Sequence, residues 1–161
     1  MTQDITTSPE ANLAAAMAQF DASQLAHQTL STTAMAQNKK ALFAAMRAAG
    51  ITEIIVTFDG AGDSGQVEDI DARRGDAVVP MPDTELTLAQ VSWGISEIST
   101  SSMSLSDAVE ALAYDLLSDC HGGWENCDGA FGEFHFDAEA GTILLDYNER
   151  FTSSEQFNHS F

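Results

Sequence analysis

Residues 133–147 read Glu-Phe-His-Phe-Asp-Ala-Glu-Ala-Gly-Thr-Ile-Leu-Leu-Asp-Tyr, and this stretch decides the fold class. Phe134 and Phe136 lie on one side of an extended chain, and a second alternation of apolar and polar residues follows Gly141. A repeat of two predicts β-strands, and residues 138–141 are typical of a turn. The stretch therefore predicts a β-hairpin. Its polar face is expected to carry Glu133, His135, Asp137 and Asp146.

Upstream, residues 51–58 form a β-rich run, and a glycine-rich turn over residues 59–65 leads into a second, edge-like strand at 66–70. Arg73-Arg74-Gly75 and Pro80-Met81-Pro82 are typical of connecting loops. Residues 84–93 fit either a strand or a short helix. The polar Ser/Thr run at 99–104 is interpreted as a loop.

Helices are expected at two places in the chain. Ser104 is a good cap for a helix whose apolar stripe begins at Leu105 and continues through Val109 and Leu112. Residues 8–49 predict two Ala- and Met-rich helices, the first starting at Ser8 and the second covering about 34–49, before Gly50.

This order of elements predicts an α+β fold, in which an antiparallel sheet built from two hairpins carries helices packed on one face. The 161 residues are interpreted as a single domain, with an N-terminal helical part at 8–49 and an acidic α+β body at 51–161. Three phenylalanines in the polar tail, Phe151, Phe157 and Phe161, predict that the tail docks on the body.

Charge is the strongest compositional signal. Six basic residues stand against 25 acidic ones, for a formal net charge of −19, and Arg73 and Arg74 are the only basic residues between positions 51 and 149. Such a surface repels phosphate backbones, so direct binding to nucleic acid is not expected. It would attract basic partners or divalent cations, although an acidic surface can also be merely solvated.

Apolar runs are short, and the first residues lack the basic start and apolar stretch of a signal peptide. We therefore expect a cytoplasmic protein that does not bind membranes. In a reducing compartment Cys120 and Cys127 are expected to be free thiols, because their spacing matches no established zinc motif.

The first candidate site lies within residues 59–71. Asp59, Asp63 and Glu68 could hold a divalent cation, since hard cations prefer carboxylate and carbonyl oxygens. The run lacks the spacing of a calcium loop, and glycine and aspartate also suit a wide hairpin turn. The Gly-Asp-Ser-Gly sequence at 62–65 resembles a serine-protease motif, but no histidine pattern supports that chemistry.

The second candidate site is residues 121–128, His-Gly-Gly-Trp-Glu-Asn-Cys-Asp. Trp124 with Glu125 and Asp128 would make a recognition patch, in which the tryptophan serves as the anchor. Together with His135 and the cysteines, the same segment could form a zinc site. Alternatively, Trp124 fills the space between the helix that starts near Ser104 and the sheet.

Two stretches carry a resemblance to a known family: residues 56–66, Val-Thr-Phe-Asp-Gly-Ala-Gly-Asp-Ser-Gly-Gln, and residues 122–134, which include Gly-Gly-Trp-Glu-Asn and Gly-Ala-Phe-Gly-Glu-Phe. They resemble an uncharacterised bacterial domain-of-unknown-function family associated with proteobacterial plasmids and prophages. The resemblance covers about residues 51–161. It implies an accessory protein of a mobile element and supplies no catalytic residue.

The leading hypothesis is a non-enzymatic binding protein whose acidic surface engages a basic patch on another protein, as a DNA mimic or an inhibitor of a nucleic-acid-binding host complex. Asp59, Asp63, Glu68, Trp124, Glu125 and Asp128 are the expected contact residues. One alternative is a divalent-metal-dependent hydrolase that uses Asp59, Asp63 and Glu68 as ligands and His135 as base. Another is an interaction module or antitoxin that acts through the N-terminal helices.

Overall fold

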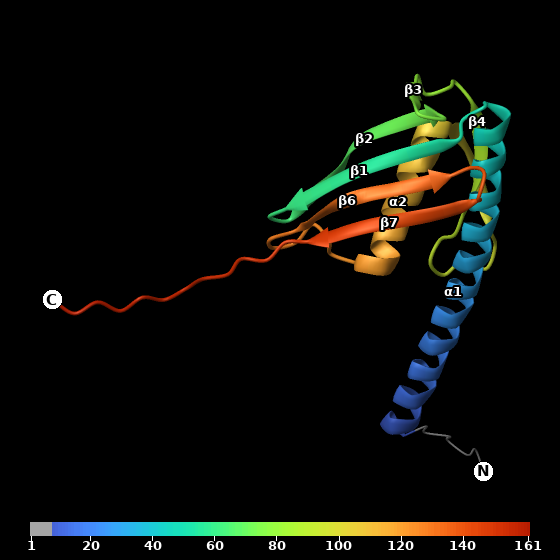
Figure 1. Ribbon diagram of the computed structural model, residues 1–161. Coiled ribbons are helices and arrows are strands. Elements are labelled where there is room, and N and C mark those ends of the chain that lie inside the picture. Colours follow the sequence, from blue (N-terminus) through green and yellow to red (C-terminus); the bar gives the residue numbers. More distant parts are fainter. Residues whose placement is uncertain (1–7) are drawn as a thin grey trace, which may run out of the picture. The chain divides into compact units, whose positions relative to one another are not determined.

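The structure is a computed structural model that describes residues 8–161. Contacts divide the described chain into a smaller unit, residues 8–38 with 87–101, and a larger unit, residues 39–86 with 102–161. The elements in chain order are α1 (Pro9–Ala48), β1 (Glu53–Ala61), β2 (Ser64–Arg74), β3 (Ala77–Val79), β4 (Glu85–Gln90), β5 (Ser99–Ser104), α2 (Leu105–His121), β6 (Ala130–Asp137) and β7 (Thr142–Glu149) (Figure 1).

The larger unit is built on a five-stranded antiparallel sheet with the order β3-β2-β1-β6-β7. The predicted α+β class and antiparallel sheet are therefore confirmed. β1 is the central strand and pairs with β2 on one side and β6 on the other. It therefore joins strands β1–β3, at residues 53–79, to the C-terminal hairpin of β6 and β7, at residues 130–149.

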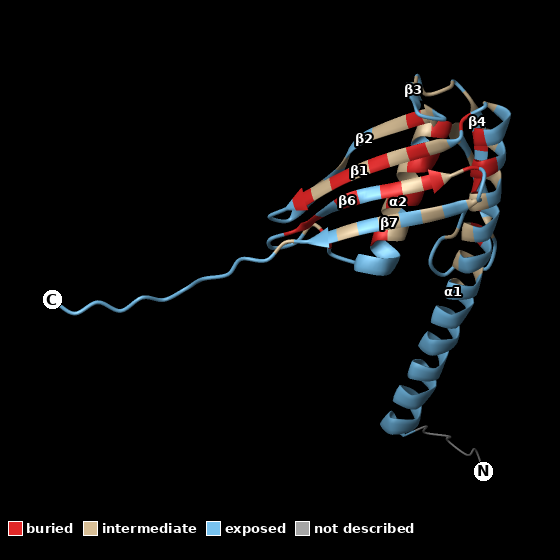
Figure 2. Ribbon diagram, in the orientation of Figure 1, coloured by how far each residue is buried: buried red, intermediate tan, exposed pale blue. Residues whose placement is uncertain are grey.

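The core of this unit lies between the sheet and α2. Burial alternates along β1 and β6, as Figure 2 shows, and Ile54, Val56 and Phe58 of β1 are fully buried. Phe134 and Phe136 of β6 share that face. Complete burial of side chains of this size contributes about 1.5–3 kcal/mol each. The buried face of α2 comprises Leu105, Ala108, Val109, Leu112, Ala113 and Leu117.

The predicted start of α2 is confirmed, because the Ser104 hydroxyl accepts a hydrogen bond of 3.1 Å from the backbone N–H of Asp107. The predicted loop at 99–104 is wrong. These residues form β5, which pairs with β4, and β4 settles the ambiguous stretch at 84–93 as a strand. Serine and threonine residues in a strand form backbone hydrogen bonds to the neighbouring strand. The polarity of their side chains therefore does not distinguish a strand from a loop.

The prediction of two N-terminal helices is also wrong, because α1 is one continuous helix of 40 residues. The polar stretch that suggested a break stays helical, and its hydroxyls donate to carbonyls one turn back: Ser23 to Gln19, Thr29 to Leu25, Thr32 to Gln28 and Thr33 to Thr29. Over the described residues, neither helix combines the length and apolarity needed to cross a membrane.

The last ten residues of α1 belong to the larger unit, where Leu42, Phe43 and Met46 are buried. Gly50 ends the helix at a φ of 70°, and the Arg47 guanidinium donates to the Ala138 carbonyl at 2.6 Å. This end of α1 is thereby fixed to the turn between β6 and β7.

The smaller unit contains the N-terminal part of α1 and most of β4 and the following loop. Asn38, 6% exposed, accepts from the Ala89 N–H at 2.6 Å and donates to the Ala89 carbonyl at 2.9 Å. The amide side chain pairs with β4 as a neighbouring strand would, so its burial leaves no polar group unsatisfied.

The turn between β1 and β2 is shorter than predicted. Ala61 pairs with Ser64, and only Gly62 and Asp63 form the turn, both at positive φ. This is the geometry of a two-residue hairpin turn. β2 extends to Arg74, so the loop expected at 73–75 is reduced to a turn at Gly75 and Asp76 before β3.

The prediction that the tail docks on the body is wrong for its phenylalanines. Residues 150–161 have no regular structure, and Phe151, Phe157 and Phe161 are 85%, 69% and 116% exposed. Only the start of the tail is held, since the Thr152 N–H donates to the Asp128 carboxylate and the Arg150 N–H to the Gly129 carbonyl.

Candidate functional site

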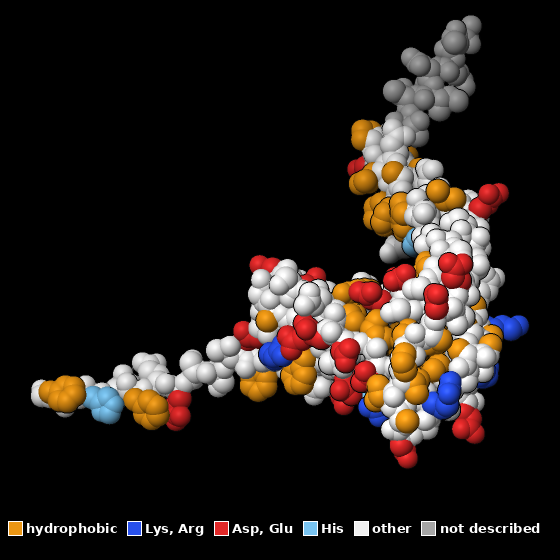
Figure 3. All heavy atoms as spheres, turned by 90° about the horizontal axis from the view of Figure 1, so that it is seen from above, with side chains coloured by type: hydrophobic (Ala, Val, Ile, Leu, Met, Phe, Trp, Pro, Cys, Tyr) orange, Lys and Arg blue, Asp and Glu red, His pale blue; other side chains and the backbone are white. Residues whose placement is uncertain are grey.

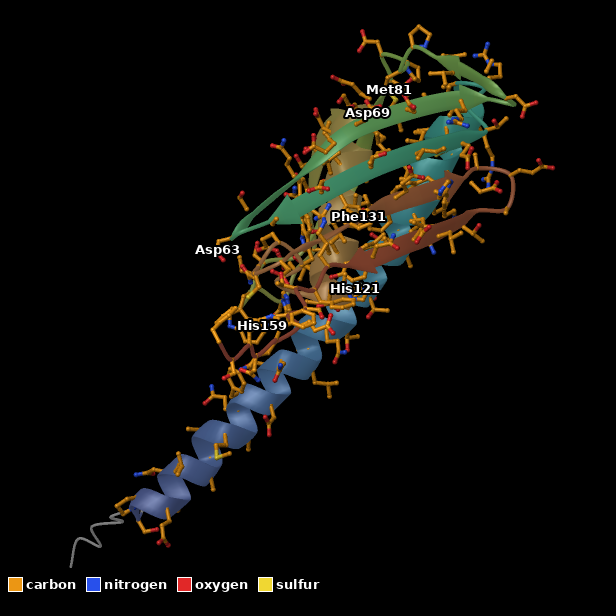
Figure 4. The ribbon with its side chains drawn as sticks, turned by 60° about the vertical axis from the view of Figure 1, so that its left-hand side comes forward. Asp63, Asp69, Met81, His121, Phe131 and His159 are labelled. Carbon is orange, nitrogen blue, oxygen red and sulfur yellow. The ribbon has the colours of Figure 1, made fainter. Side chains whose placement is uncertain are left out.

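The sheet face opposite α2 carries a row of carboxylates that crosses four strands. Asp69 of β2 pairs with Thr57 of β1, Thr57 pairs with Glu133 of β6, and Glu133 pairs with Asp146 of β7. We call these four residues the acidic row. Neighbouring strands lie about 4.8 Å apart, so Glu133 and Asp146 are directly adjacent. Figure 4 labels Asp69 on β2.

A bulge in β2 adds a further carboxylate beside the acidic row. The register between β1 and β2 shifts at Thr57/Phe58, which leaves Glu68 as an extra residue between Val67 and Asp69. Glu68 lines a shallow pocket of about 540 Å³ together with Thr57, Glu133 and Asp146. The bulge therefore turns a second acidic side chain of β2 toward the same surface.

The next row toward the β1–β2 turn contains an aromatic side chain. Phe131 of β6 pairs with Asp59 of β1 and is 41% exposed, in the position that Figure 4 labels. The Arg150 guanidinium lies 4.6 Å from the Phe131 ring centroid, and its Nη2 is 2.5 Å from Oδ2 of Asp59. Arg150 thus neutralises the charge of Asp59, and part of the Phe131 ring remains exposed to solvent.

His135 lies one row further along the same face, between two carboxylates. Its Nδ1 is 3.0 Å from Glu53 Oε1, and its Nε2 is 3.4 Å from Glu133 Oε2. Both ring nitrogens therefore face protein carboxylates, and neither is aimed at a free position where a substrate could stand. Leu144 of β7, opposite His135 in the register, is 65% exposed.

We use the term open face for the exposed part of this sheet surface. Its charged members other than Asp59 form no ion pair with any Lys or Arg among residues 8–161. It contains an aromatic and an aliphatic side chain among carboxylates. The open face comprises Thr57, Asp59, Glu68, Asp69, Phe131, Glu133, Leu144 and Asp146.

The two glycine-rich segments meet around a tryptophan. The Gly62 N–H donates to the Cys127 carbonyl at 2.9 Å, and the Asp63 N–H donates to the Glu125 carbonyl at 3.2 Å. Trp124 is 8% exposed and packs edge-on against Phe58, with ring centroids 5.4 Å apart. Its burial favours the packing interpretation and removes Trp124 from any exposed contact surface.

Asp63 and Glu125 lie together at this junction, where they line one shallow pocket with Trp124, but they are not part of the open face. Asp63 lies in the β1–β2 turn, in the position labelled in Figure 4, and Asp128 accepts from the backbone of Thr152. Glu125 is half-buried beside Gly65, against whose added Cβ its own Cβ would lie at 2.9 Å. Of the six residues predicted as contacts, only Asp59 and Glu68 belong to the open face.

The arrangement of ligand types does not fit the metal alternative. Over residues 8–161, no three His, Cys, Asp or Glu side chains are grouped so that they could hold a metal ion. The Asp59 carboxylate forms an ion pair with Arg150, and Asp63 belongs to the β1–β2 turn and not to the open face. Cys120 and Cys127 are free thiols, as predicted, and both are exposed.

Two pKa shifts accompany this packing. Burial, reinforced by the neighbouring Glu149, raises the pKa of Tyr147, whose ring stacks on His121 at 3.6 Å between centroids. Burial, reinforced by Asp119 one helical turn further on, raises the pKa of Asp115 on α2. Neither residue lies on the open face, since Tyr147 points to the side opposite Asp146.

Residues 34–161 match the model of a family described as "Family of unknown function (DUF6878)". The chain belongs to this family. The DUF6878 match includes all strands of the sheet, α2 and the open face, whereas residues 8–33 of the described chain lie outside it. Comparison of the chain with curated proteins and with solved structures found no match in either set.

Membership of DUF6878 assigns no activity, so the site rests on geometry. Sequence reasoning placed Glu133, His135 and Asp146 on one polar face of the last hairpin, and the register confirms that Glu133 and Asp146 are opposite each other. It missed Asp69, Phe131 and Leu144. The alternation of β6 gives a partial signal for Phe131, which shares the side of Glu133 and His135.

Proposed function

We propose that this protein is a non-enzymatic binding protein whose open face engages a basic surface on another protein. The observation that carries the proposal is the acidic row, in which three carboxylates cross four strands without a Lys or Arg partner in residues 8–161. Charge complementarity of this kind steers association and fixes the orientation of the partner.

The pairing of Glu133 with Asp146 supports a role in binding rather than in folding. Like charges directly opposite each other in antiparallel strands destabilise a sheet by up to about 1 kcal/mol. Sequences that break a local rule of this kind commonly do so at functional sites. A basic partner would remove the repulsion by placing a cation between the two carboxylates.

Phe131 and Leu144 supply the apolar part of the proposed contact. Both are exposed, and they lie in the rows on either side of the acidic row. Interfaces gain most of their affinity from a few such anchors, whereas charges at the rim mainly set specificity and rate. The proposed partner therefore presents Lys or Arg around a hydrophobic depression.

A nucleic-acid-binding surface is the basic target we propose, because carboxylates can take the positions of phosphates. In this proposal the protein acts as a DNA mimic or an inhibitor of such a complex, which suits the plasmid or prophage setting that the sequence resemblance implies. The geometry does not favour the hydrolase, since Asp59 is neutralised and both nitrogens of His135 are occupied.

The test is a capture experiment with matched variants in a nuclease-treated bacterial lysate. The tagged wild-type protein is compared with Asp69→Lys/Asp146→Lys, which reverses two exposed charges of the acidic row. The control is Asp83→Lys/Glu139→Lys, which has the same net charge but changes two exposed positions in loops. Retained proteins are eluted with rising salt and identified by mass spectrometry.

The proposal predicts a basic nucleic-acid-binding protein that wild type and control retain, that the acidic-row variant loses, and that salt releases. Equal loss of the basic protein by the two variants would show that net charge, not the open face, is responsible, and its retention by the acidic-row variant would contradict the proposal. Absence of any retained basic protein would equally contradict the proposal.

A further inference from the structure

The N-terminal part of α1 presents a row of large apolar side chains to solvent. Every residue from 8 to 26 is exposed, and Leu13, Met17 and Phe20 are 62%, 59% and 57% exposed. Their spacing of four and then three residues places them on one side of the helix. Figure 3 shows hydrophobic side chains gathered along this part of α1.

A loop of the same unit extends this apolar surface. Trp93 packs on Phe20 and His27, with ring centroids 6.1 and 5.0 Å apart, and these two helical residues are two turns apart on the same side. Trp93 nevertheless remains 55% exposed, and Ile95 beside it is 56% exposed. We call Leu13, Met17, Phe20, Trp93 and Ile95 the helix patch.

The helix that carries the patch has little to stabilise it by itself. Residues 9–26 of α1 are all exposed, whereas most of the stability of helices in proteins comes from packing an apolar face against another surface. The serine and threonine hydroxyls that bond back to carbonyls, such as Ser23 to Gln19 and Thr29 to Leu25, slightly destabilise a helix further. Burial of its apolar side against another surface would supply the missing stabilisation.

Charge indicates what covers the helix patch. Residues 9–38 and 87–101 contain only Glu10, Asp21 and Glu97 as charged residues, in a chain of net charge −19. A basic partner would therefore form few ion pairs with this unit. Two copies of the chain repel each other over their acidic larger units, and this nearly neutral surface is where they can meet at little electrostatic cost.

We infer that the helix patch is a homodimer interface, in which α1 of one copy packs against α1 of a second copy. The five side chains expose roughly 600 Å² per copy, so a symmetric pair buries about 1,200 Å², the lower limit for a specific interface. An antiparallel arrangement of the two helices also aligns their dipoles favourably.

Analytical ultracentrifugation of the full chain tests this inference. The wild-type protein should sediment at twice the mass of one chain. Phe20→Glu introduces a charge into the centre of the patch in both copies, and the dimer should weaken about hundredfold or more. The matched control is Leu25→Glu, because Leu25 is also exposed, at 66%, but lies about 140° around the helix from Phe20.

Circular dichroism of both variants checks that the helix content remains. A monomeric wild-type protein would overturn the inference and leave the patch for a different protein. A wild-type dimer that Phe20→Glu leaves intact, or that Leu25→Glu disrupts equally, would overturn it as well. These outcomes are independent of the proposed function, whose variants at Asp69 and Asp146 lie on the open face.

Discussion

At the residue scale, the junction between the β1–β2 turn and the loop before β6 depends on glycines. A Cβ on Gly60 would lie 2.6 Å from the Trp124 ring, and a Cβ on Gly129 would overlap the backbone carbonyl of Gly60. Gly129 also has a φ of 75°, where other residues are strained. Because Gly60 has no side chain, it leaves the space that the buried Trp124 ring fills.

Gly129→Ala should destabilise the protein by about 3 kcal/mol or more, because a backbone conflict is added to the strain of positive φ. Gly62→Ala is the control, since Gly62 has a φ of 63° but nothing within 4 Å of its added Cβ. Its cost should be limited to about 1–2 kcal/mol. Urea unfolding measures both, and equal losses would show that the packing at Gly129 is not tight.

Trp124 also shows why single residues can be predicted only in part. The sequence allowed it to be an exposed anchor or a packing residue, because both occur in glycine-containing loops. The choice depends on Gly60 and Gly65 of a segment far away in the chain, which leave room for the ring. Ser104, in contrast, was predicted as a cap because its partner Asp107 lies three residues on.

At the scale of elements, local patterns predicted the strands and failed for α1 and β5. The alternation in β6 and β7 follows from one face packing on α2, so burial and sequence agree. In α1 the stretch around Thr29 has no apolar period, yet the helix continues because nothing in it, such as proline, breaks the backbone ladder. The sequence of β5 is polar and shows no alternation of apolar residues from which a strand could be predicted. It is a strand because it pairs with β4.

Helix α2 carries a charge placement that can be tested by pH. Burial and the neighbouring Asp119 raise the pKa of Asp115 above its ordinary value of 3.8, so the folded protein disfavours the ionised form. Asp115→Asn should therefore stabilise the protein by about 0.3 kcal/mol at pH 7. The gain should vanish as the pH falls below 3.8, where the wild-type carboxyl is protonated in both folded and unfolded chains.

Thermal unfolding at pH 7 and at pH 3 measures this difference. Asp107→Asn provides the control on the same helix, because Asp107 lies in the first turn, where a negative charge favours the helix dipole. That substitution should lower the stability at pH 7. A stabilising effect of Asp107→Asn, or a gain from Asp115→Asn that persists at pH 3, would contradict this account of α2.

At the scale of the whole molecule, charge and apolar surface are separated along the sequence. The acidic residues concentrate in the larger unit, where the open face combines carboxylates with Phe131 and Leu144. The helix patch belongs to the nearly neutral smaller unit, and residues 8–33 lie outside the family match. The proposed dimer would thus present two open faces and strengthen binding to a partner with two basic sites.

Net charge and the α+β class could be predicted from composition and periodicity, whereas the site could not. The acidic row exists only because β1 lies between β2 and β6, which brings Asp69 and Glu133 to either side of Thr57. These two carboxylates are far apart in the sequence, and no local pattern specifies the strand order. The predicted contact residues were instead chosen from the two glycine-rich segments and, for Glu68, from the strand that follows the first of them. Only Asp59 and Glu68 proved to be near the row.

Chemical-shift mapping can locate the contact of a basic partner on the sheet. The isotope-labelled protein is titrated with the unlabelled basic protein that the capture experiment retains, and amide shifts are followed by NMR. We expect the largest changes in the strands of the acidic row, around Asp69, Thr57, Glu133 and Asp146, and small changes in α2. Largest changes in α2 or around Trp124, with the acidic row unaffected, would contradict the proposed contact.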